Sequence, residues 1–170
     1  TTKAKVINEK RINSLNIKVI PNPIRKIESN GVERQNIILS VGRLIRTKNH
    51  DRLIKLFLDL KLKDWKLIIV GDGPERKRLE QLIQQTNSEN NVLLAGNQKN
   101  VDEFYSKSKI FAFTSSSEGF PNVLGEALSA GLAVISFDCV AGPADMIDHN
   151  ENGILVPVND YELFKRELDD

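Results

Sequence analysis

Two glutamates, Glu118 and Glu126, lie eight positions apart in the segment Glu-Gly-Phe-Pro-Asn-Val-Leu-Gly-Glu. Between them Gly119 supplies flexibility, and Pro121 can open a helix that good helix formers continue. The start of a helix offers unpaired backbone N–H groups and a positive dipole end, which suit a phosphate. Carboxylates repel a phosphate, so the glutamates would instead accept hydrogen bonds from attached ribose or sugar hydroxyls. The segment therefore predicts a nucleotide-sugar site.

Two basic residues, Arg43 and Lys48, follow the apolar segment 37–41, which is a predicted strand. Beyond the end of a strand they would neutralise a diphosphate, Arg through two parallel hydrogen bonds and Lys as a mobile point charge. Because Arg46 lies between them, a basic turn exposed to solvent is the alternative.

The glycines of Gly71-Asp72-Gly73 follow a second predicted strand. The dinucleotide-binding fingerprint needs a small residue three places after its second glycine, and Arg76 occupies that position. The pattern therefore argues against NAD. It is typical of a tight turn from strand to helix, where a glycine lets a ligand approach the backbone.

Other catalytic patterns are missing from the sequence. His50, His149 and Cys139 do not have the spacing of metal ligands, so we expect no bound metal and no cofactor. His50 is expected to be a helix-start or surface residue. Without a Gly-x-Ser-x-Gly elbow, the serines at 115–117 are expected to form a polar strand end rather than a nucleophile.

Composition narrows the class of protein. Among 170 residues, 24 Lys and Arg nearly balance 23 Asp and Glu, and the net charge of +1 argues against nucleic-acid binding. Cys139 is the only cysteine, and no apolar run approaches the roughly 18 residues of a membrane helix, so we expect a cytoplasmic protein. Because the chain begins with Thr1 rather than Met, we expect it to be part of a longer protein.

Short apolar segments alternate with segments whose apolar residues have helical spacing. Strands are predicted at 37–41, 66–70, 91–95, 110–113, 133–137 and 154–156, and helices at 49–60, from Pro74 onward, and at 100–107, 121–130, 142–148 and 160–168. This order predicts an α/β, Rossmann-like three-layer domain with a parallel sheet of about six strands. Residues 1–30 are expected to form a helix, a short strand and an interdomain connector, and residues 31–170 the nucleotide-sugar-binding domain.

Several segments together resemble the retaining glycosyltransferases of family 4, also called group 1. The shared motifs are Val41-Gly42-Arg43 with Lys48-Asn49, Gly71 to Pro74, Ser116 to Ala127, Gly131 to Ile135, and Asn152 to Val156. They match in order and spacing over roughly residues 18–168. Such enzymes have the GT-B fold, two Rossmann-like domains that face a cleft, and this chain resembles the C-terminal, donor-binding domain.

The resemblance implies a role for each motif. Arg43 and Lys48 would hold the diphosphate and stabilise the leaving group without a metal, Glu118 would contact the donor sugar, and Glu126 would bind the ribose. The helix start would bind the phosphate and the sugar through the segment made of Gly119, Phe120, Pro121, Asn122, Val123 and Leu124. The backbone near Asn97 would read the base, and Gly73 would lie close to the nucleotide.

The resemblance also implies partners. A sugar would be transferred from a nucleoside-diphosphate sugar to an acceptor hydroxyl with retained configuration, in glycan or glycolipid biosynthesis. The pair Gly142-Pro143 resembles members that use UDP-sugars. The missing N-terminal domain would hold the acceptor, for which a lipid-linked sugar at the inner membrane face is one candidate, so the chain alone would be inactive.

Two alternatives stay open at this stage. One is a sugar-nucleotide epimerase domain of the same fold group; a phosphorylase would need a cofactor lysine site that the sequence does not offer. The other is a non-catalytic Rossmann-like domain that binds a partner through its apolar helices. Binding of a nucleoside diphosphate would separate the transferase from the partner-binding domain.

Overall fold

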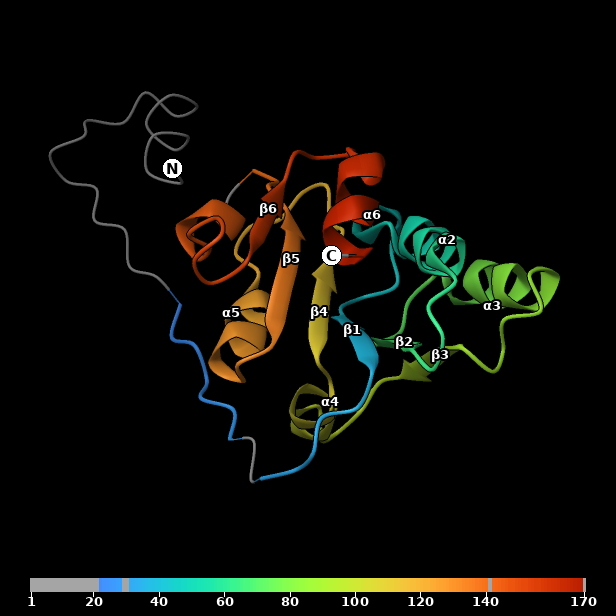
Figure 1. The fold of residues 1–170 in the computed structure, drawn as a ribbon, viewed down its shortest axis with the longest axis horizontal. Coiled ribbons are helices and arrows are strands. Elements are labelled where there is room, and N and C mark those ends of the chain that lie inside the picture. Colours follow the sequence, from blue (N-terminus) through green and yellow to red (C-terminus); the bar gives the residue numbers. More distant parts are fainter. Residues whose placement is uncertain (1–21, 29–30, 141, 170) are drawn as a thin grey trace, which may run out of the picture.

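The computed structural model describes residues 22–28, 31–140 and 142–169. Its strands form one parallel six-stranded sheet in the order β3-β2-β1-β4-β5-β6 (Figure 1). The strands are β1 (Ile37–Val41), β2 (Lys66–Val70), β3 (Val92–Gly96), β4 (Ile110–Phe113), β5 (Ala133–Phe137) and β6 (Ile154–Val156). The predicted α/β, Rossmann-like architecture is confirmed.

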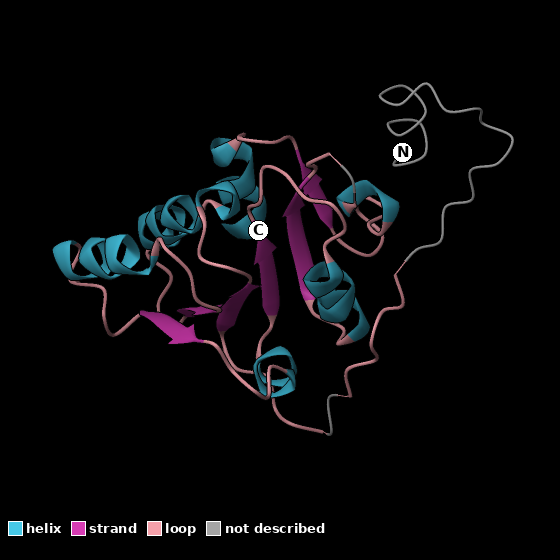
Figure 2. Cartoon of the chain, turned by 180° about the vertical axis from the view of Figure 1, so that it is seen from behind, coloured by secondary structure: helices cyan, strands magenta, loops and turns pink. Residues whose placement is uncertain are grey.

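The helices form two layers, one on each face of the sheet (Figure 2). They are α2 (His50–Leu60), α3 (Arg76–Gln85), α4 (Asp102–Lys107), α5 (Asn122–Ser129) and α6 (Tyr161–Asp169). Helices α2, α3 and α6 share one apolar core with the sheet, and α4 and α5 share the other.

Strand β4 shows why the central strands are almost wholly apolar. Phe111 and Phe113 pack into the core under α4 and α5, whereas Ala112 between them packs into the core under α2 and α6. Successive side chains of a strand point to opposite faces, and both faces are covered here, so all three of these residues are buried, while Ile110 at the start of the strand is partly buried.

The predicted element bounds agree closely with the structure. Five strands have the predicted limits, and β3 lies one residue later than expected. The helix predicted at 142–148 is wrong in extent. Only a short 3-10 helix forms there, at Pro143–Asp145, and Gly142 before it has a φ of 130°, which is not helical. Gly131, two residues beyond α5, has a φ of 71°, the left-handed conformation in which helices commonly end.

The described part of the predicted connector, residues 22–28, contains no helix or strand and runs beside α5 (Figure 1). Its Ile27 is 3% exposed and belongs to the core under α4 and α5. The helix and strand expected farther toward the N-terminus lie outside the described residues.

The sheet order reverses between β1 and β4, and this point positions the site. The chain leaves β1 toward α2 on one face and leaves β4 toward α5 on the other, which opens a crevice at the carboxyl ends of the two strands. Hydrogen bonds fix the two loops to each other: Thr114 Oγ1 donates to the Lys48 carbonyl (2.8 Å), and Asn49 Nδ2 donates to the Thr114 carbonyl (2.9 Å).

Candidate functional site

Lys48 and Glu118 meet in this crevice. Lys48 ends the 3-10 helix Arg46–Lys48, Glu118 lies in the loop after β4, and Lys48 Nζ forms an ion pair with Glu118 Oε1. The side chains are only 16% and 13% exposed, and Lys48 Nζ lies 5.2 Å from the centre of the Phe113 ring. The cation expected to bind a diphosphate and the carboxylate expected to bind the sugar are therefore direct neighbours.

The start of α5 lies on the same loop as Glu118. The N–H of Asn122 donates to the Phe120 carbonyl (3.1 Å), and the N–H of Leu124 donates to the Pro121 carbonyl (2.9 Å). Pro121 has no N–H. In the part of the chain that the structure describes, no acceptor meets the N–H groups of Gly119, Phe120 and Val123. These three are thus the donors that the segment 119–124 can offer to an anion.

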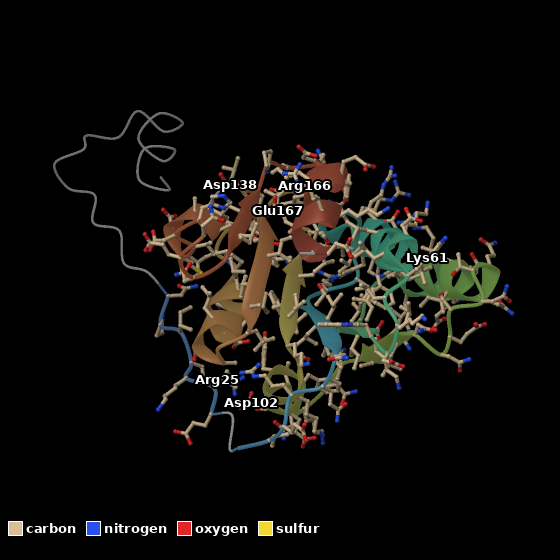
Figure 3. All side chains as sticks on the ribbon, in the orientation of Figure 1. Arg25, Lys61, Asp102, Asp138, Arg166 and Glu167 are labelled. Atoms are coloured by element: carbon tan, nitrogen blue, oxygen red, sulfur yellow. The ribbon has the colours of Figure 1, made fainter. Side chains whose placement is uncertain are left out.

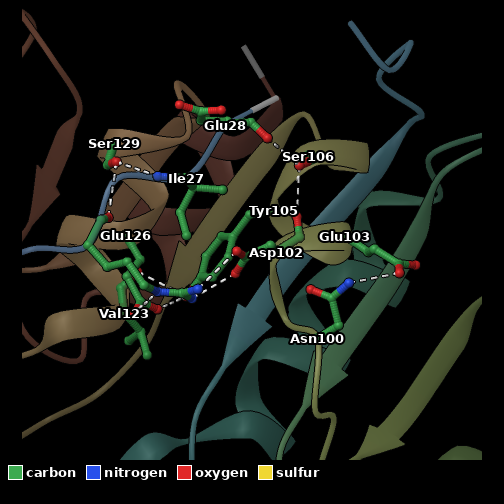
Figure 4. A network of polar contacts seen from close by, with 11 residues as sticks. Ile27, Glu28, Asn100, Asp102, Glu103, Tyr105, Ser106, Val123, Glu126 and Ser129 are labelled. Carbon is green, nitrogen blue, oxygen red and sulfur yellow. Dashed lines mark hydrogen bonds and ion pairs between the residues drawn. The ribbon is translucent and has the colours of Figure 1, made fainter. Parts of the chain in front are cut away.

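Glu126 lies one turn into α5 and is held from two sides (Figure 4). The Tyr105 hydroxyl donates to Glu126 Oε2 (3.0 Å), and Arg25 Nε lies 3.8 Å from Glu126 Oε1. Burial, and then the charge of Glu126, raise the pKa of the Tyr105 hydroxyl far above its usual range, so it remains a hydrogen-bond donor. The Glu126 side chain keeps 21% of its surface exposed and can accept further hydrogen bonds.

Gly71 and Gly73 allow the turn after β2 to pack closely against the turn after β1. A Cβ on Gly71 would lie 2.1 Å from the Gly42 carbonyl oxygen, and one on Gly73 would lie 2.4 Å from the Leu44 carbonyl oxygen. The Leu44 N–H donates to the Asp72 carbonyl (3.0 Å), which joins the turns. The Leu44 backbone therefore fills the space where a side chain at position 73 would lie, and the closeness of Gly73 to the nucleotide stays a prediction.

A cleft of about 380 Å³ opens at the carboxyl ends of β1, β2 and β3. It brings together Arg43 and Asn97, two of the predicted site residues, and Gly42 also lines it. Lys48 packs against Gly42, since its Cε lies 3.4 Å from the place of a Gly42 Cβ. Both Arg43 and Asn97 are exposed, so they are accessible to a bound molecule. Gly73 does not line this cleft.

Two buried titratable groups accompany the site. His50 begins α2, as predicted, but it is 4% exposed rather than a surface residue, and its Nδ1 has no partner among the described residues. Burial and the charge of Lys48 lower the pKa of His50 to about 4. Burial, and then the charge of Glu118, raise the pKa of the Cys139 thiol to about 11, so neither group suits acid–base or nucleophilic chemistry near neutral pH.

Two contacts of the site could not be foreseen from the sequence. Tyr105 lies within the helix predicted at 100–107, and no sequence motif marks its hydroxyl as part of a site. Arg25 lies in the segment expected to be a connector. Within residues 22–28, 31–140 and 142–169, no three His, Cys, Asp or Glu residues come together as metal ligands, and no helix could span a membrane.

Comparison with known proteins places these motifs in a family. The family model described as "Glycosyl transferases group 1" matches residues 23–170. The amylovoran biosynthesis glycosyltransferase AmsD of Erwinia amylovora is 36% identical over 147 residues, which make up 86% of this chain and 41% of AmsD. The chain thus spans less than half the length of that curated relative.

Solved structures agree with this match. A mutant of S. aureus TarM, in complex with Fondaparinux, alpha-GlcNAc-glycerol and UDP, has a TM-score of 0.90 and 25% identity over 98% of this chain and 34% of that one. The C-terminal domain of a glycosyl transferase group 1 family protein (LpcC) from Francisella tularensis has a TM-score of 0.67 and 26% identity over 80% of this chain and 75% of that one. The chain therefore belongs to the group 1 glycosyltransferases.

Proposed function

We propose that this chain is the C-terminal, donor-binding domain of a retaining glycosyltransferase that uses a UDP-sugar. The observation that carries the proposal is the Lys48–Glu118 pair at the start of α5, where the sheet order reverses. A cation, a carboxylate and open backbone N–H groups at one point suit a sugar joined to a diphosphate. The similarity to the Francisella tularensis C-terminal domain supports the assignment to that half of the enzyme.

The diphosphate would bind to Lys48, to Arg43 and to the N–H groups of Phe120 and Val123. These groups would stabilise the negative charge of the departing nucleoside diphosphate, as preorganised donors do in an oxyanion hole, so the transfer needs no metal. A charge-assisted hydrogen bond contributes on the order of 1.5–3 kcal/mol, and a few of them give binding in the micromolar range.

The sugar and the ribose of the donor would be recognised by hydrogen-bond acceptors of the protein. Glu118 would accept hydrogen bonds from sugar hydroxyls, and Glu126 from the ribose hydroxyls. The base would enter the cleft beside Asn97. UDP as the nucleotide is supported by the TarM complex, which contains UDP. The resemblance to the retaining enzymes supports retention of configuration as part of this proposal.

The acceptor would be bound outside this domain. We propose that an N-terminal domain holds it, in glycan or glycolipid biosynthesis, and that the chain alone binds the donor without transferring the sugar. A lipid-linked acceptor and a cytoplasmic site at the inner membrane face stay predictions. No contact among the described residues favours an epimerase or a partner-binding domain.

Calorimetric titration of the chain with UDP, GDP and UDP-sugars tests the proposal. We expect UDP to bind, and Glu126→Ala to weaken it by about 1–3 kcal/mol. Glu103→Ala is the matched control, because this carboxylate is 61% exposed on α4 and pairs with Lys107. The absence of binding by any nucleoside diphosphate at millimolar concentration would contradict the proposal.

A further inference from the structure

The connector segment, residues 22–28, runs along the whole of α5, from Asn122 at the start of the helix to Ser129 at its end. Asn22 Nδ2 donates to Asn122 Oδ1 (3.3 Å), and the N–H of Ile27 donates to Ser129 Oγ (3.0 Å). Between these ends, Ile24 packs on Gly125 and Arg25 approaches Glu126. The helix partners 122, 125, 126 and 129 are spaced three and four apart, which places them along one face.

The opposite face of α5 is buried as well. Leu124 and Ala127 are fully buried in the core with the sheet. The helix that carries Glu126 is therefore held between the sheet and the connector, and its position depends on both.

Gly125 allows the connector to come this close. A Cβ at this position would lie 2.5 Å from Ile24 Cδ1 and 2.9 Å from Ile24 Cγ1. A glycine inside a helix is less favourable than alanine, because it loses more conformational freedom on folding. Close packing with Ile24 is the structural reason for a glycine here.

Arg25 extends from the connector toward Asp102 of α4 (Figure 3) and also lies beside Glu126 of the predicted ribose site. Its guanidinium donates one hydrogen bond to the Asp102 carboxylate, Nη1 to Oδ2 (2.9 Å), and forms an ion pair with it through Nη2 and Oδ1 (2.7 Å). These contacts with Asp102 hold the guanidinium so that its Nε lies 3.8 Å from Glu126 Oε1, within ion-pair distance. Tyr105 donates to Oε2, so one oxygen of Glu126 accepts a hydrogen bond and the other lies beside a cation.

We propose that Arg25 is a positioning residue that orients the Glu126 carboxylate for the ribose of the nucleotide. The inference rests on the proposed ribose role of Glu126 and adds a residue from outside the group 1 motifs. A glutamate side chain has three rotatable bonds, and a hydrogen bond at Oε2 with a cation beside Oε1 reduces the freedom that ribose binding would otherwise remove. By linkage, ribose binding and attachment of the connector then strengthen each other.

The test measures two ligands on the full chain by calorimetry. UDP carries a ribose, whereas inorganic pyrophosphate presents only the charges expected to meet Arg43 and Lys48. We expect Arg25→Gln to raise the Kd of UDP by about threefold to tenfold and to leave that of pyrophosphate unchanged. Lys26→Gln is the matched control, because this neighbour is 82% exposed and pairs only with Glu28 among the described residues.

A double-mutant cycle separates positioning from general damage. In a Glu126→Gln background, we expect Arg25→Gln to have little further effect on UDP. An equal loss in both backgrounds, a parallel loss of pyrophosphate, or no loss at all would overturn the inference while wild-type UDP binding upheld the proposed function. A wild-type chain that bound neither UDP nor GDP would overturn the proposed function, and the role of Arg25 with it.

Discussion

Lys48 and Glu118 form an ion pair that joins the loop after β1 to the loop after β4. Both side chains are mostly shielded from water, so the attraction between them is stronger than at an exposed surface. The carboxylate neutralises the cation to which a diphosphate is expected to bind. A donor that enters the site must therefore share Lys48 with Glu118.

Glu118→Gln should tighten the binding of UDP while it slows sugar transfer by the intact enzyme. The variant removes a negative charge beside the diphosphate, and we expect a gain of roughly 1 kcal/mol, about fivefold in Kd. Calorimetry of UDP measures it, with the exposed Glu89→Gln as control. Weaker UDP binding in the variant would show that Glu118 supports Lys48 rather than competing for it.

Lys48→Met should both destabilise the fold and weaken UDP. It leaves Glu118 shielded from water without its cation, at a cost on the order of 2 kcal/mol in the free energy of unfolding. The double variant Lys48→Met with Glu118→Gln should recover most of this loss, but not UDP binding. Urea unfolding measures the loss of stability in the double variant and in the two single variants, which together complete the double-mutant cycle. A double variant as unstable as Lys48→Met would argue against the pair.

His50 should make stability depend on pH. Its pKa of about 4 in the folded chain lies below the ordinary 6.5, so between these values the unfolded chain binds a proton that the folded chain does not. The free energy of unfolding should therefore decrease as the pH falls from 6.5 to 4, by up to roughly 3 kcal/mol from this group. His50→Leu should lose less stability over this range in urea titrations; an unchanged profile would contradict the assignment.

Gly73→Ala should destabilise the chain by roughly 2–3 kcal/mol, because the new methyl group would overlap the Leu44 carbonyl and force the two turns apart. Gly119→Ala is the matched comparison, since nothing lies within 4 Å of a Cβ at that position. Thermal unfolding of both variants tests the difference. Equal melting temperatures would mean that the turns can separate without cost.

The sequence predicted the strands well because each is a short apolar segment buried on both faces, which is a local pattern. Arg43, Lys48, Glu118 and Asn97 all follow strands, and the carboxyl ends of parallel strands share one edge of the sheet, so their common location also has a local origin. Contacts between distant side chains could not be predicted in this way. Glu126 meets Tyr105 only because α4 and α5 pack on the same face of the sheet.

The glycines show a second limit of sequence reasoning. A glycine after a strand indicates close approach, but its pattern does not say which group approaches. At Gly73 that group is the Leu44 backbone, and at Gly125 it is the Ile24 side chain. Both depend on the path of a segment elsewhere in the chain, which only the folded structure defines.

The buried thiol of Cys139 offers a chemical reporter for the crevice. It is 2% exposed and close enough to Glu118 for that charge to raise its pKa, and it is the only thiol in the chain. An alkylating reagent should therefore react only in molecules whose loop after β5 has opened. The rate of labelling then measures how often the site opens, without any dye or added tag.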